Sequence, residues 1–447
     1  MPTIFPFRAI TYAGVRDVSN LVAPPYDVLD KGGKQRLLDK DPRNIVAIDL
    51  PHTPAKELGP PAAYDAAARA LRDLLGNGTL RAADQPVIFA YRQTFTGQDG
   101  ATTVRRTGMA CCVETVPFGP RAGGGVLPHE ETFSGPKEDR MALMKATRTQ
   151  LSPIFGLHAD ERGLATALLA TVTSSRAPDT TATTDDATLH ELWTITDQPT
   201  IEAYRAALAG EDVFIADGHH RYTTGLNYLR GLEAAGPVGP DHPARRCMMV
   251  LVGMRDPGLV IWPTHRVLGG MAGYSLEAFL AAAGDHVKAE PVAGDLHAVH
   301  RAMHERTDLG DERFALWDFA RSQGLVAAPA RSDALAKQFP HRPRAWRTLS
   351  VAFAQYVLVE DICQGRLNGG KPVKWAFPHT VREVEEIGRG QETGAGGGAG
   401  FAQLAVLVRP TPLEAVREVS RANELMPQKS TFFYPKLATG LFMNPLE

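Results

Sequence analysis

At one point in the chain a strand, a sharp turn and a helix are predicted to follow one another without spare residues. The apolar run Val213–Ala216 predicts a buried strand, and it stops at the polar sequence DGHHR of residues 217–221. Directly afterwards Leu226, Leu229 and Leu232 recur at helical spacing. The sequence therefore places an aspartate, two histidines and an arginine at a strand-to-helix turn.

The same alternation of strands and helices extends along the rest of the chain. Further strands are predicted at Val87–Tyr91, Gly108–Val116, Ser152–His158, Cys247–Gly253 and Leu259–Pro263, and further helices at Asp139–Thr147 and Ile201–Leu208. We expect the turn at residues 96–100 to join the first two of these strands, and the turn MRDPG to pair the last two. This pattern predicts an α/β (mixed α+β) fold.

Composition excludes several classes of protein. The 447 residues carry 48 Lys plus Arg against 50 Asp plus Glu, so no basic field is available to hold a nucleic acid. No apolar stretch reaches the roughly eighteen residues of a membrane span, and the first residues lack a secretion signal. Four cysteines without CxxC spacing argue against a disulfide scaffold and a structural zinc site. We expect a cytoplasmic protein that binds small molecules and can form a homo-oligomer.

Two segments of biased composition are predicted to be loops, and the two ends of the chain are predicted to pair. Gly394–Gly400 reads GAGGGAG and predicts a mobile loop, and Thr173–Thr184 predicts a surface connection. The apolar runs Thr3–Ile10 and Ala438–Leu446 suggest that the two ends of the chain meet in one sheet.

The DGHHR turn has the features of an anion site. A helix start offers backbone N–H groups without intrahelical acceptors and the positive end of the helix dipole, which suits a phosphate. Gly218 lets the chain turn, and Arg221 can hold two oxygens at once. Adjacent side chains diverge, so we assign either His219 or His220 to the ligand and the other to packing.

The remaining residues of the turn are given roles on the same reasoning. Asp217 can hold Mg²⁺ or orient a hydroxyl nucleophile, and Thr223 in the first turns of the helix is a further phosphate ligand. The alternative is that Asp217 caps the helix and that the histidines make ordinary polar contacts. The position between a strand and a helix favours the anion site.

Four other clusters contain candidate site residues, each with a structural alternative. The segment His129–Arg140 gathers charged residues beside a Gly-Pro turn, among them Glu130, Glu131, Lys137 and Arg140; a solvated loop before a capped helix explains them equally well. Further candidates are Tyr26 and Asp27 for the substrate, His265 and Arg266 for phosphate, and Lys429 for catalysis. Structural turns and core packing are the alternatives for these five.

Two motifs resemble a known fold. The sequence IADGHHRYTTGLNY of residues 215–228 is similar to the signature motif of the ParB/sulfiredoxin-like fold. The variant of this motif that reads DGHHR resembles the one found in the free serine kinases of that superfamily. The segment Val126–His158 resembles the rest of that module. The resemblance implies a nucleotide, ATP or ADP, and a glutamate as general base, matched here by Glu130 or Glu131. Residues 159–200 form an insertion that resembles a helix plus a hairpin.

The whole chain resembles an uncharacterised prokaryotic family, number 1015 among the domains of unknown function. Its landmarks are FPFRAI at Phe5–Ile10, APPYDV at Ala23–Val28, HEETFSGPKEDR at His129–Arg140, ADGHHRY at Ala216–Tyr222, PTHR at Pro263–Arg266 and MPQKSTFFYPK at Met426–Lys436. We expect an N-terminal α/β segment at 1–120, the ParB/sulfiredoxin-like module at 121–267 and a C-terminal α/β segment at 268–447.

The combined features predict a phosphotransferase that uses ATP or ADP and Mg²⁺ to phosphorylate a small hydroxyl compound, such as serine or a related hydroxy acid. In this hypothesis Gly218, His219 and Arg221 hold the transferred phosphate, Asp217 neutralises it through Mg²⁺, and Glu130 or Glu131 takes the hydroxyl proton. Two alternatives stay open. One is a nucleotide-binding switch without turnover, and the other is a metal-dependent phosphoester hydrolase.

Overall fold

The computed structural model describes residues 3–54, 57–130, 134–391 and 396–447. The chain forms two compact units. Unit 1 comprises Met1–Pro128, Thr132–Val260 and Phe433–Glu447, and unit 2 comprises His129–Glu131 and Ile261–Phe432. Among the described helices, none has both the length and the apolar character that a membrane span requires.

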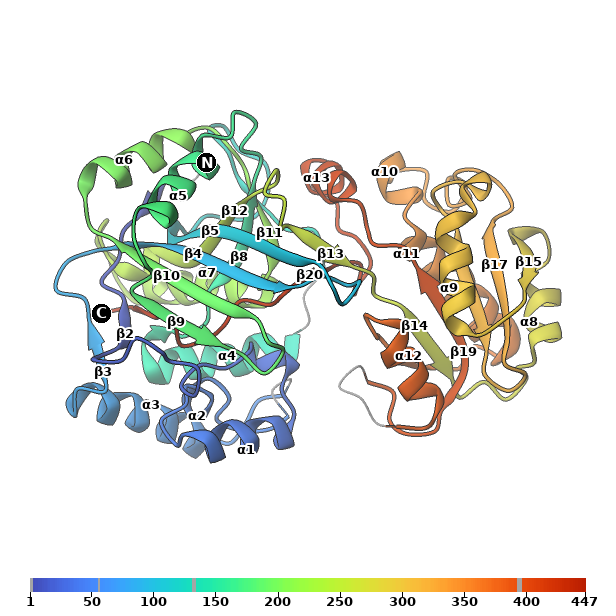
Figure 1. Cartoon of the computed structure of the whole chain (residues 1–447), viewed down its shortest axis with the longest axis horizontal. Coiled ribbons are helices and arrows are strands. Elements are labelled where there is room, and N and C mark those ends of the chain that lie inside the picture. Colours follow the sequence, from blue (N-terminus) through green and yellow to red (C-terminus); the bar gives the residue numbers. More distant parts are fainter. Residues whose placement is uncertain (1–2, 55–56, 131–133, 392–395) are drawn as a thin grey trace. The chain divides into compact units, whose positions relative to one another are not determined.

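Unit 1 is built on a nine-stranded mixed sheet with the order β6-β11-β8-β12-β5-β4-β10-β9, and β1 pairs with β5 outside this path (Figure 1). The strands of the sheet are β1 (Ile4–Phe5), β4 (Ile88–Thr96), β5 (Thr103–Glu114), β6 (Val126–Leu127), β8 (Ile154–His158), β9 (Thr180–Thr183), β10 (Leu189–Ile195), β11 (Val213–Asp217) and β12 (Arg246–Gly253). Smaller ladders join β2 (Ile10–Tyr12) to β3 (Leu80–Ala82), and β7 (Thr149–Gln150) to β21 (Asn444–Pro445).

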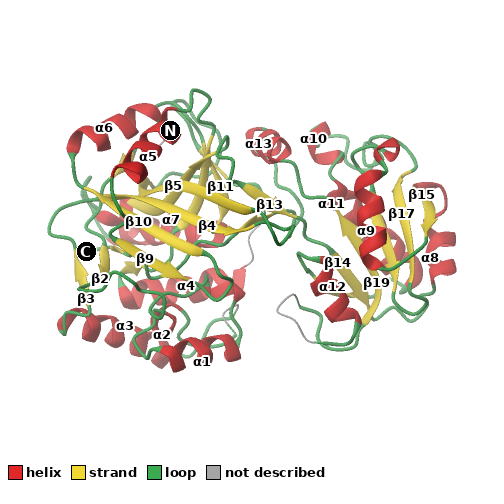
Figure 2. Ribbon diagram, viewed as in Figure 1, coloured by secondary structure: helices red, strands yellow, loops and turns green. Residues whose placement is uncertain are grey.

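Helices cover both faces of this sheet. They are α1 (Lys31–Lys40), α2 (Val46–Asp49), α3 (Pro61–Gly76), α4 (Ser134–Thr147), α5 (Leu164–Ser175), α6 (Gln198–Ala207) and α7 (His219–Ala235), with short turns η1 (Tyr26–Val28) and η2 (Pro243–Arg245). Figure 2 shows α5 and α6 along one side of the sheet, and α3 and α4 along the other. Helix α7 packs on α4 and against β8 and β12. The core beneath α5 and α6 contains Trp193 and Tyr204, both fully buried.

Unit 2 contains a six-stranded antiparallel sheet with the order β15-β17-β16-β19-β14-β18. Its strands are β14 (Arg266–Gly269), β15 (Val287–Val292), β16 (Phe314–Asp318), β17 (Gln323–Pro329), β18 (Lys374–Ala376) and β19 (Ala402–Val408). Its helices are α8 (Leu276–Ala283), α9 (Leu296–Glu305), α10 (Arg344–Arg347), α11 (Ser350–Phe353), α12 (Val381–Gly388) and α13 (Leu413–Arg421), with η3 (Gly284–His286), η4 (Thr307–Leu309) and η5 (Ala354–Leu367).

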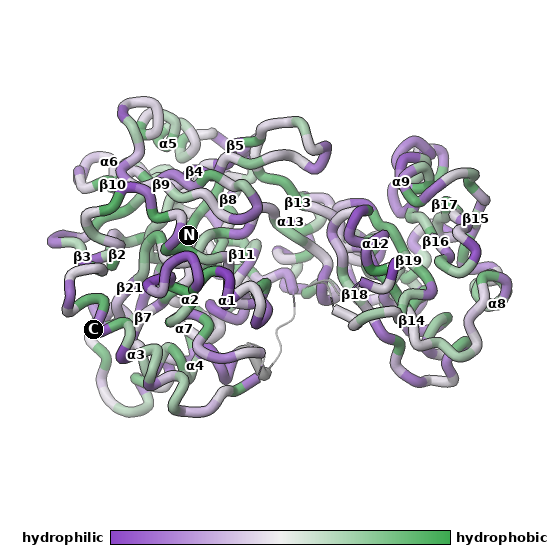
Figure 3. The backbone as a smooth tube through the Cα atoms, turned by 60° about the horizontal axis from the view of Figure 1, so that its bottom comes forward, coloured by the Kyte–Doolittle hydropathy of each residue, from purple (hydrophilic) through white to green (hydrophobic). Residues whose placement is uncertain are grey.

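Side chains alternate between the two faces of this second sheet, as a sheet covered on both sides requires. Phe314 and Leu316 of β16 join one hydrophobic core with α8, α11 and η5, whereas Ala315 and Trp317 join the other core with α9 and α12. Figure 3 shows hydrophobic colouring along the strands of each unit and hydrophilic colouring along helices such as α1 and α9.

The mixed α/β fold predicted from the sequence is confirmed, and so are most of the individual strands and helices. Strands β4 and β5 pair as the predicted antiparallel hairpin. Residues 159–200 contain helix α5 and the hairpin of β9 and β10, and β10 also pairs with β4. The predicted hairpin across the turn MRDPG is wrong. Strand β12 pairs with β5 and β8 on its two sides, whereas β13 (Val260–Trp262) pairs with β20 (Phe432–Tyr434).

The two ends of the chain do meet, although in different sheets. Ile10 and Met443 form an antiparallel bridge, and the ring of Phe442 packs against those of Phe7 and Phe89. Strand β1 nevertheless belongs to the large sheet, whereas β21 pairs with β7. Of the predicted loop at 394–400, residues 394 and 395 lie outside the described residues, and residues 396–400 are a loop before β19.

The two compact units divide the chain differently from the three segments expected from the sequence. Strands β4 and β5, which precede residue 120, hydrogen-bond into the same sheet as β8 and β11. The last residues, from Phe433 onward, also belong to unit 1. Both differences come from pairing between strands that are far apart in the sequence.

Candidate functional site

The DGHHR sequence forms the turn between β11 and α7. Strand β11 is buried up to Ala216, and Gly218 precedes the helix with a φ of 95°, a conformation that glycine adopts without strain. A Cβ atom on Gly218 would lie 3.0 Å from Nε of Arg221 and 3.1 Å from its Cζ. The guanidinium of Arg221 is therefore folded back over the turn, beside the first N–H groups of α7.

Asp217 holds two cations at this turn. Its Oδ1 accepts from Nζ of Lys436 at 2.5 Å, and its Oδ2 accepts from Nη2 of Arg221. The second nitrogen of Arg221 donates to the carbonyl of Pro153. Burial alone would raise the pKa of the Asp217 carboxyl, but Lys436 and Arg221 outweigh it and hold that pKa well below its usual range. The carboxylate is therefore ionised and fixes both cations in place.

The two histidines of the turn differ in exposure. His219 is buried and His220 is half-buried. Burial lowers the pKa of the His220 imidazole, and the charge of Asp27 opposes this shift. The charges of Lys137 and Arg221 lower that pKa further. His220 is therefore a neutral imidazole at neutral pH, and two carboxylates, Asp27 and Asp217, and two cations act on it.

The other residues predicted in unit 1 take several positions. Thr223 donates its hydroxyl to the carbonyl of His219 at 2.9 Å, so this hydroxyl proton is used within α7. Asp27 is exposed and lies in η1, whereas Tyr26 is buried there. Lys137 lies half-buried on α4. Asp27 and Lys137 both lie near enough to His220 to act electrostatically on its pKa.

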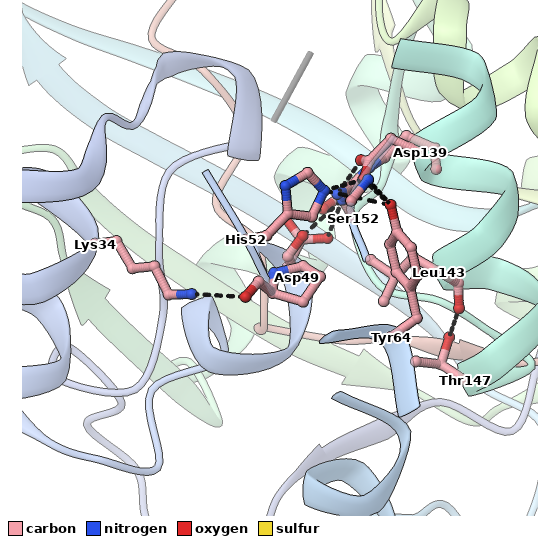
Figure 4. A network of polar contacts seen from close by, with 11 residues as sticks. Lys34, Asp49, His52, Tyr64, Asp139, Leu143, Thr147 and Ser152 are labelled. Atoms are coloured by element: carbon pink, nitrogen blue, oxygen red, sulfur yellow. Dashed lines mark hydrogen bonds and ion pairs between the residues drawn. The ribbon is translucent and has the colours of Figure 1, made fainter. Parts of the chain in front are cut away.

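Arg140, predicted to meet the substrate, is buried in a network of polar contacts instead. Its guanidinium lies 4.0 Å from the centre of the Tyr26 ring and donates to the carbonyl of Asp49 at 2.6 Å. It also forms an ion pair with Asp139 at 2.5 Å. Two further groups bind Asp139, the imidazole of His52 at 2.6 Å and the hydroxyl of Tyr64 at 2.7 Å (Figure 4). These contacts tie α4 to α2 and α3.

A small cavity adjoins both the network and the turn. It has a volume of about 40 Å³ and is lined by Tyr26, Asp49, Arg140, Leu143, Met144, Thr149, Gln150, Leu151, Ser152, Ile154, Arg221, Thr224 and Met248. This space is large enough for about three water molecules, and its walls combine apolar side chains with a few polar groups. Arg221 therefore faces both this cavity and Asp217.

Glu130 belongs to unit 2 and is engaged there by the C-terminal landmark MPQKST. Its Oε1 accepts from the backbone N–H groups of Ser430 at 3.0 Å and Thr431 at 3.1 Å, and from the Thr431 hydroxyl at 3.2 Å. Three donors therefore already engage one oxygen of this carboxylate. Glu131, the other candidate, lies outside the described residues.

His265, Arg266 and Lys429 also lie in unit 2. His265 and Arg266 are fully buried at the start of β14. Nδ1 of His265 accepts from the N–H of Val408 at 3.2 Å, and Arg266 donates to the carbonyls of Thr264 and Lys429. Burial lowers the pKa of Arg266 to about 10. These contacts fix the side chains of His265 and Arg266 within unit 2 and involve the backbone carbonyl of Lys429.

Asp217 does not fit the predicted role of magnesium ligand in this arrangement. Each of its oxygens already contacts a cation, Lys436 on one side and Arg221 on the other. A divalent ion would have to displace one of them because like charges repel at contact distance. Within the described residues, no group of three or more histidine, cysteine, aspartate or glutamate side chains is arranged to hold a metal.

Lys436 is the residue of this site that sequence reasoning missed. It follows the aromatic residues of the landmark MPQKSTFFYPK, in which only Lys429 was considered. Residues 217 and 436 are 219 positions apart, so no local pattern connects them. The sequence feature that could have indicated Lys436 is its place directly after a Tyr-Pro pair at the end of this landmark. From Phe433 onward the chain belongs to unit 1.

Comparison with known proteins identifies a family but no activity. The family described as "Protein of unknown function (DUF1015)" matches residues 4–338. No curated protein matches the chain. A mutant free serine kinase in complex with ADP matches with a TM-score of 0.34 and 12% identity, over 73% of this chain and 95% of that chain.

Two other solved structures match at a similar level. SbnI from Staphylococcus aureus, truncated at its C-terminus, gives a TM-score of 0.33 and 9% identity over 74% of this chain and 85% of its own. A conserved hypothetical protein from Pyrococcus furiosus gives 0.31 and 12% over 72% and 96%. Similarities this low support no argument about fold or function.

Proposed function

Because the chain belongs to the DUF1015 family of proteins of unknown function, its activity has to be inferred from its own residues, and we propose that it transfers a phosphoryl group between a nucleotide and the hydroxyl of a small acceptor. The observation that carries this proposal is the turn at Gly218. There, Arg221 is folded over the start of a 17-residue helix, and Lys436 is held beside it by Asp217.

Charge at this turn suits a phosphate group. The two cations and the one carboxylate leave one net positive charge, and the N-terminal dipole of α7 adds to it. Backbone N–H groups at a helix start are aimed at an anion, and a guanidinium offers two parallel donors. Gly218 has no side chain, so the ligand can approach the backbone closely.

Phosphoryl transfer requires little of the protein beyond such positioning. The transition state spreads negative charge over the oxygens of the transferred group, and fixed cations stabilise that charge. Arg221 and Lys436 are fixed before the nucleotide arrives because Asp217 holds both, so they need no rearrangement during the reaction. We assign them to the phosphate groups of the nucleotide and assign Asp217 to orienting them.

The base that removes the acceptor's proton is assigned to His220. Its imidazole is half-buried beside the turn, and its lowered pKa keeps it neutral and able to accept a proton at neutral pH. Asp27 lies near enough to act on it electrostatically and would stabilise the imidazolium that forms. Glu130, which the resemblance implies, is the alternative, although its carboxylate is already engaged by three donors. Serine and related hydroxy acids are the acceptors to test first.

Two measurements test this proposal. Binding of ADP and ATP is measured by calorimetry, and phosphorylation is followed by ³¹P NMR with magnesium chloride and a panel of hydroxy acids. We expect Arg221→Met to weaken nucleotide binding by about tenfold or more, the value of one charge-assisted hydrogen bond. Arg230→Met, at an exposed position of the same helix, is the matched control.

The outcomes separate the hypotheses. If nucleotides bind at this turn and no acceptor is phosphorylated, the protein is a nucleotide-binding switch without turnover. If nucleotides do not bind, or bind equally well in both variants, the assignment of the turn is wrong.

A further inference from the structure

We propose that Arg106 and Gln93 form a backbone clamp, hereafter the Arg106–Gln93 clamp, that positions Lys436 against Asp217 as a phosphate-contacting residue. This inference rests on the proposed function for the role of Lys436, but not for the clamp itself. All four residues belong to unit 1.

The clamp begins with two neighbouring side chains of the large sheet. Gln93 on β4 and Arg106 on β5 are directly paired across the two strands, and both are buried. Oε1 of Gln93 accepts from Nη2 of Arg106, which leaves its amide nitrogen free to donate elsewhere. The Arg106 guanidinium lies 4.5 Å from the centre of the Phe155 ring.

Together these side chains bind three consecutive backbone carbonyls. Arg106 donates to the carbonyl of Tyr434 at 2.9 Å and to that of Pro435 at 2.6 Å. The Gln93 amide donates to the carbonyl of Lys436 at 2.9 Å. Three successive residues, the last of β20 and the two that follow it, are therefore held by side chains that are themselves bonded to each other.

The clamp ends at the ion pair of the site. The backbone of Lys436 is fixed at its carbonyl, and its Nζ reaches Asp217 at 2.5 Å. A lysine side chain is long and flexible and usually adopts many conformations. Here the backbone hydrogen bond restricts one end of the side chain and the ion pair with Asp217 restricts the other. The ammonium group is thereby presented beside Arg221, at the start of α7.

Burying the charged side chain of Arg106 costs free energy that a purely structural role does not explain. It is 1% exposed, and burial lowers its pKa to about 10. No carboxylate among the described residues forms an ion pair with it, and its Nε has no hydrogen-bond partner there. A buried charge without an ionic partner is costly. The placement of Lys436 gives this cost a functional reason.

Unit 2 supplies a matched control. Arg313 is also buried, and like Arg106 it donates to backbone carbonyls, in this case three: those of Met303 at 2.6 Å, Gly310 at 2.6 Å and His304 at 3.0 Å. The substitution Arg313→Lys therefore removes a comparable set of backbone hydrogen bonds, none of which involves residues 434–436.

The test measures the reactivity of the Lys436 amine by acetylation with a water-soluble ester at low reagent concentration, quantified by mass spectrometry. The full-length protein is compared with the variants Arg106→Lys, Gln93→Leu and Arg313→Lys. We expect acetylation of Lys436 to accelerate about tenfold in the first two, since each loses a hydrogen bond that confines the segment, and to stay unchanged in the third. An unchanged rate in both clamp variants would overturn the proposal, as would equal acceleration in Arg313→Lys.

Nucleotide affinity provides a second and separate measurement. Because Arg106 acts through Lys436, the loss of ADP affinity in the double variant Arg106→Lys/Lys436→Met should equal that in Lys436→Met alone. Additive losses would contradict a positioning role. Should the wild-type protein bind no nucleotide, the proposed function fails, while the acetylation experiment still decides whether the clamp exists.

Discussion

Replacing Gly218 with alanine separates the binding role of the turn from its structural role. Gly218 has a φ of 95°, where an L-residue is strained by roughly 1–2 kcal/mol. The new Cβ would also lie 3.0 Å from Nε of Arg221, closer than the usual contact of about 3.5 Å between heavy atoms. The guanidinium must therefore move away from the start of α7.

Gly210 offers a control for the strain. Its φ is 84°, and a Cβ there would meet no atom within 4 Å. Both Gly218→Ala and Gly210→Ala should lower the free energy of unfolding by about 1–2 kcal/mol. Only Gly218→Ala should also displace Arg221, which costs a charge-assisted bond to phosphate of about 1.5–3 kcal/mol and weakens ADP binding by about 10- to 100-fold.

Urea unfolding and calorimetry with ADP measure the two effects separately. The reasoning is refuted if Gly218→Ala binds ADP as the wild type does, because the phosphate would then not depend on the position of Arg221. It is also refuted if both variants lose affinity equally, since backbone strain alone would then account for the loss.

Three further predictions concern His220, Asp217 and the four cysteines. The acid limb of kcat/KM should lie below the ordinary histidine pKa of about 6.5, because burial lowers the pKa of His220 and only the neutral imidazole accepts a proton; a pH profile of His220→Gln that keeps this limb would exclude His220 as the base. The Asp217→Asn variant should lose about 3 kcal/mol at pH 7, since Lys436 and Arg221 then face each other uncompensated. The folded-state pKa of Asp217 is depressed, so this stabilisation is fully present above the unfolded pKa of about 4 and is lost progressively as the pH falls from there towards the lower folded-state pKa; urea titrations from pH 7 to 3 should show a smaller decline in the variant. Iodoacetamide should leave the four buried cysteines of the native protein unmodified at pH 8, because burial raises the pKa of each thiol, and should modify all four after denaturation; rapid modification of the native protein would show that one of them is accessible.

The DGHHR turn could be located from the sequence because everything that forms it is local. A buried strand, a glycine and a helical repeat of leucines follow one another within residues 213–232. Short-range patterns of this kind determine β11 and α7, and the ion pair of Asp217 with Arg221 spans only four residues. The hairpin of β4 and β5 was predictable for the same reason.

Contacts between distant segments could not be predicted in this way. Lys436 reaches Asp217 through a backbone that is held by Arg106 and Gln93, more than 300 residues earlier in the chain. The hairpin predicted across MRDPG failed on similar grounds, since β12 finds β5 on one side and β8 on the other. A strand with strong partners on both sides leaves no edge for its neighbour in sequence.

Arg140 and Glu130 illustrate a second limit. Charge and proximity to a Gly-Pro turn made both of them candidates, and in the structure both charges are engaged by other groups of the protein. Arg140 is paired with Asp139 beneath the Tyr26 ring, and Glu130 is bound by Ser430 and Thr431. The sequence shows which side chains are charged, but it does not show which of them form buried hydrogen bonds or ion pairs within the protein.

A structure of the protein with bound ADP tests the central claim most directly. The account predicts that the phosphate groups lie on the N–H groups at the start of α7, within hydrogen-bond distance of Arg221 and Lys436, with both cations still held by Asp217. Phosphates bound elsewhere, with the turn at Gly218 empty at saturating ADP, would contradict it.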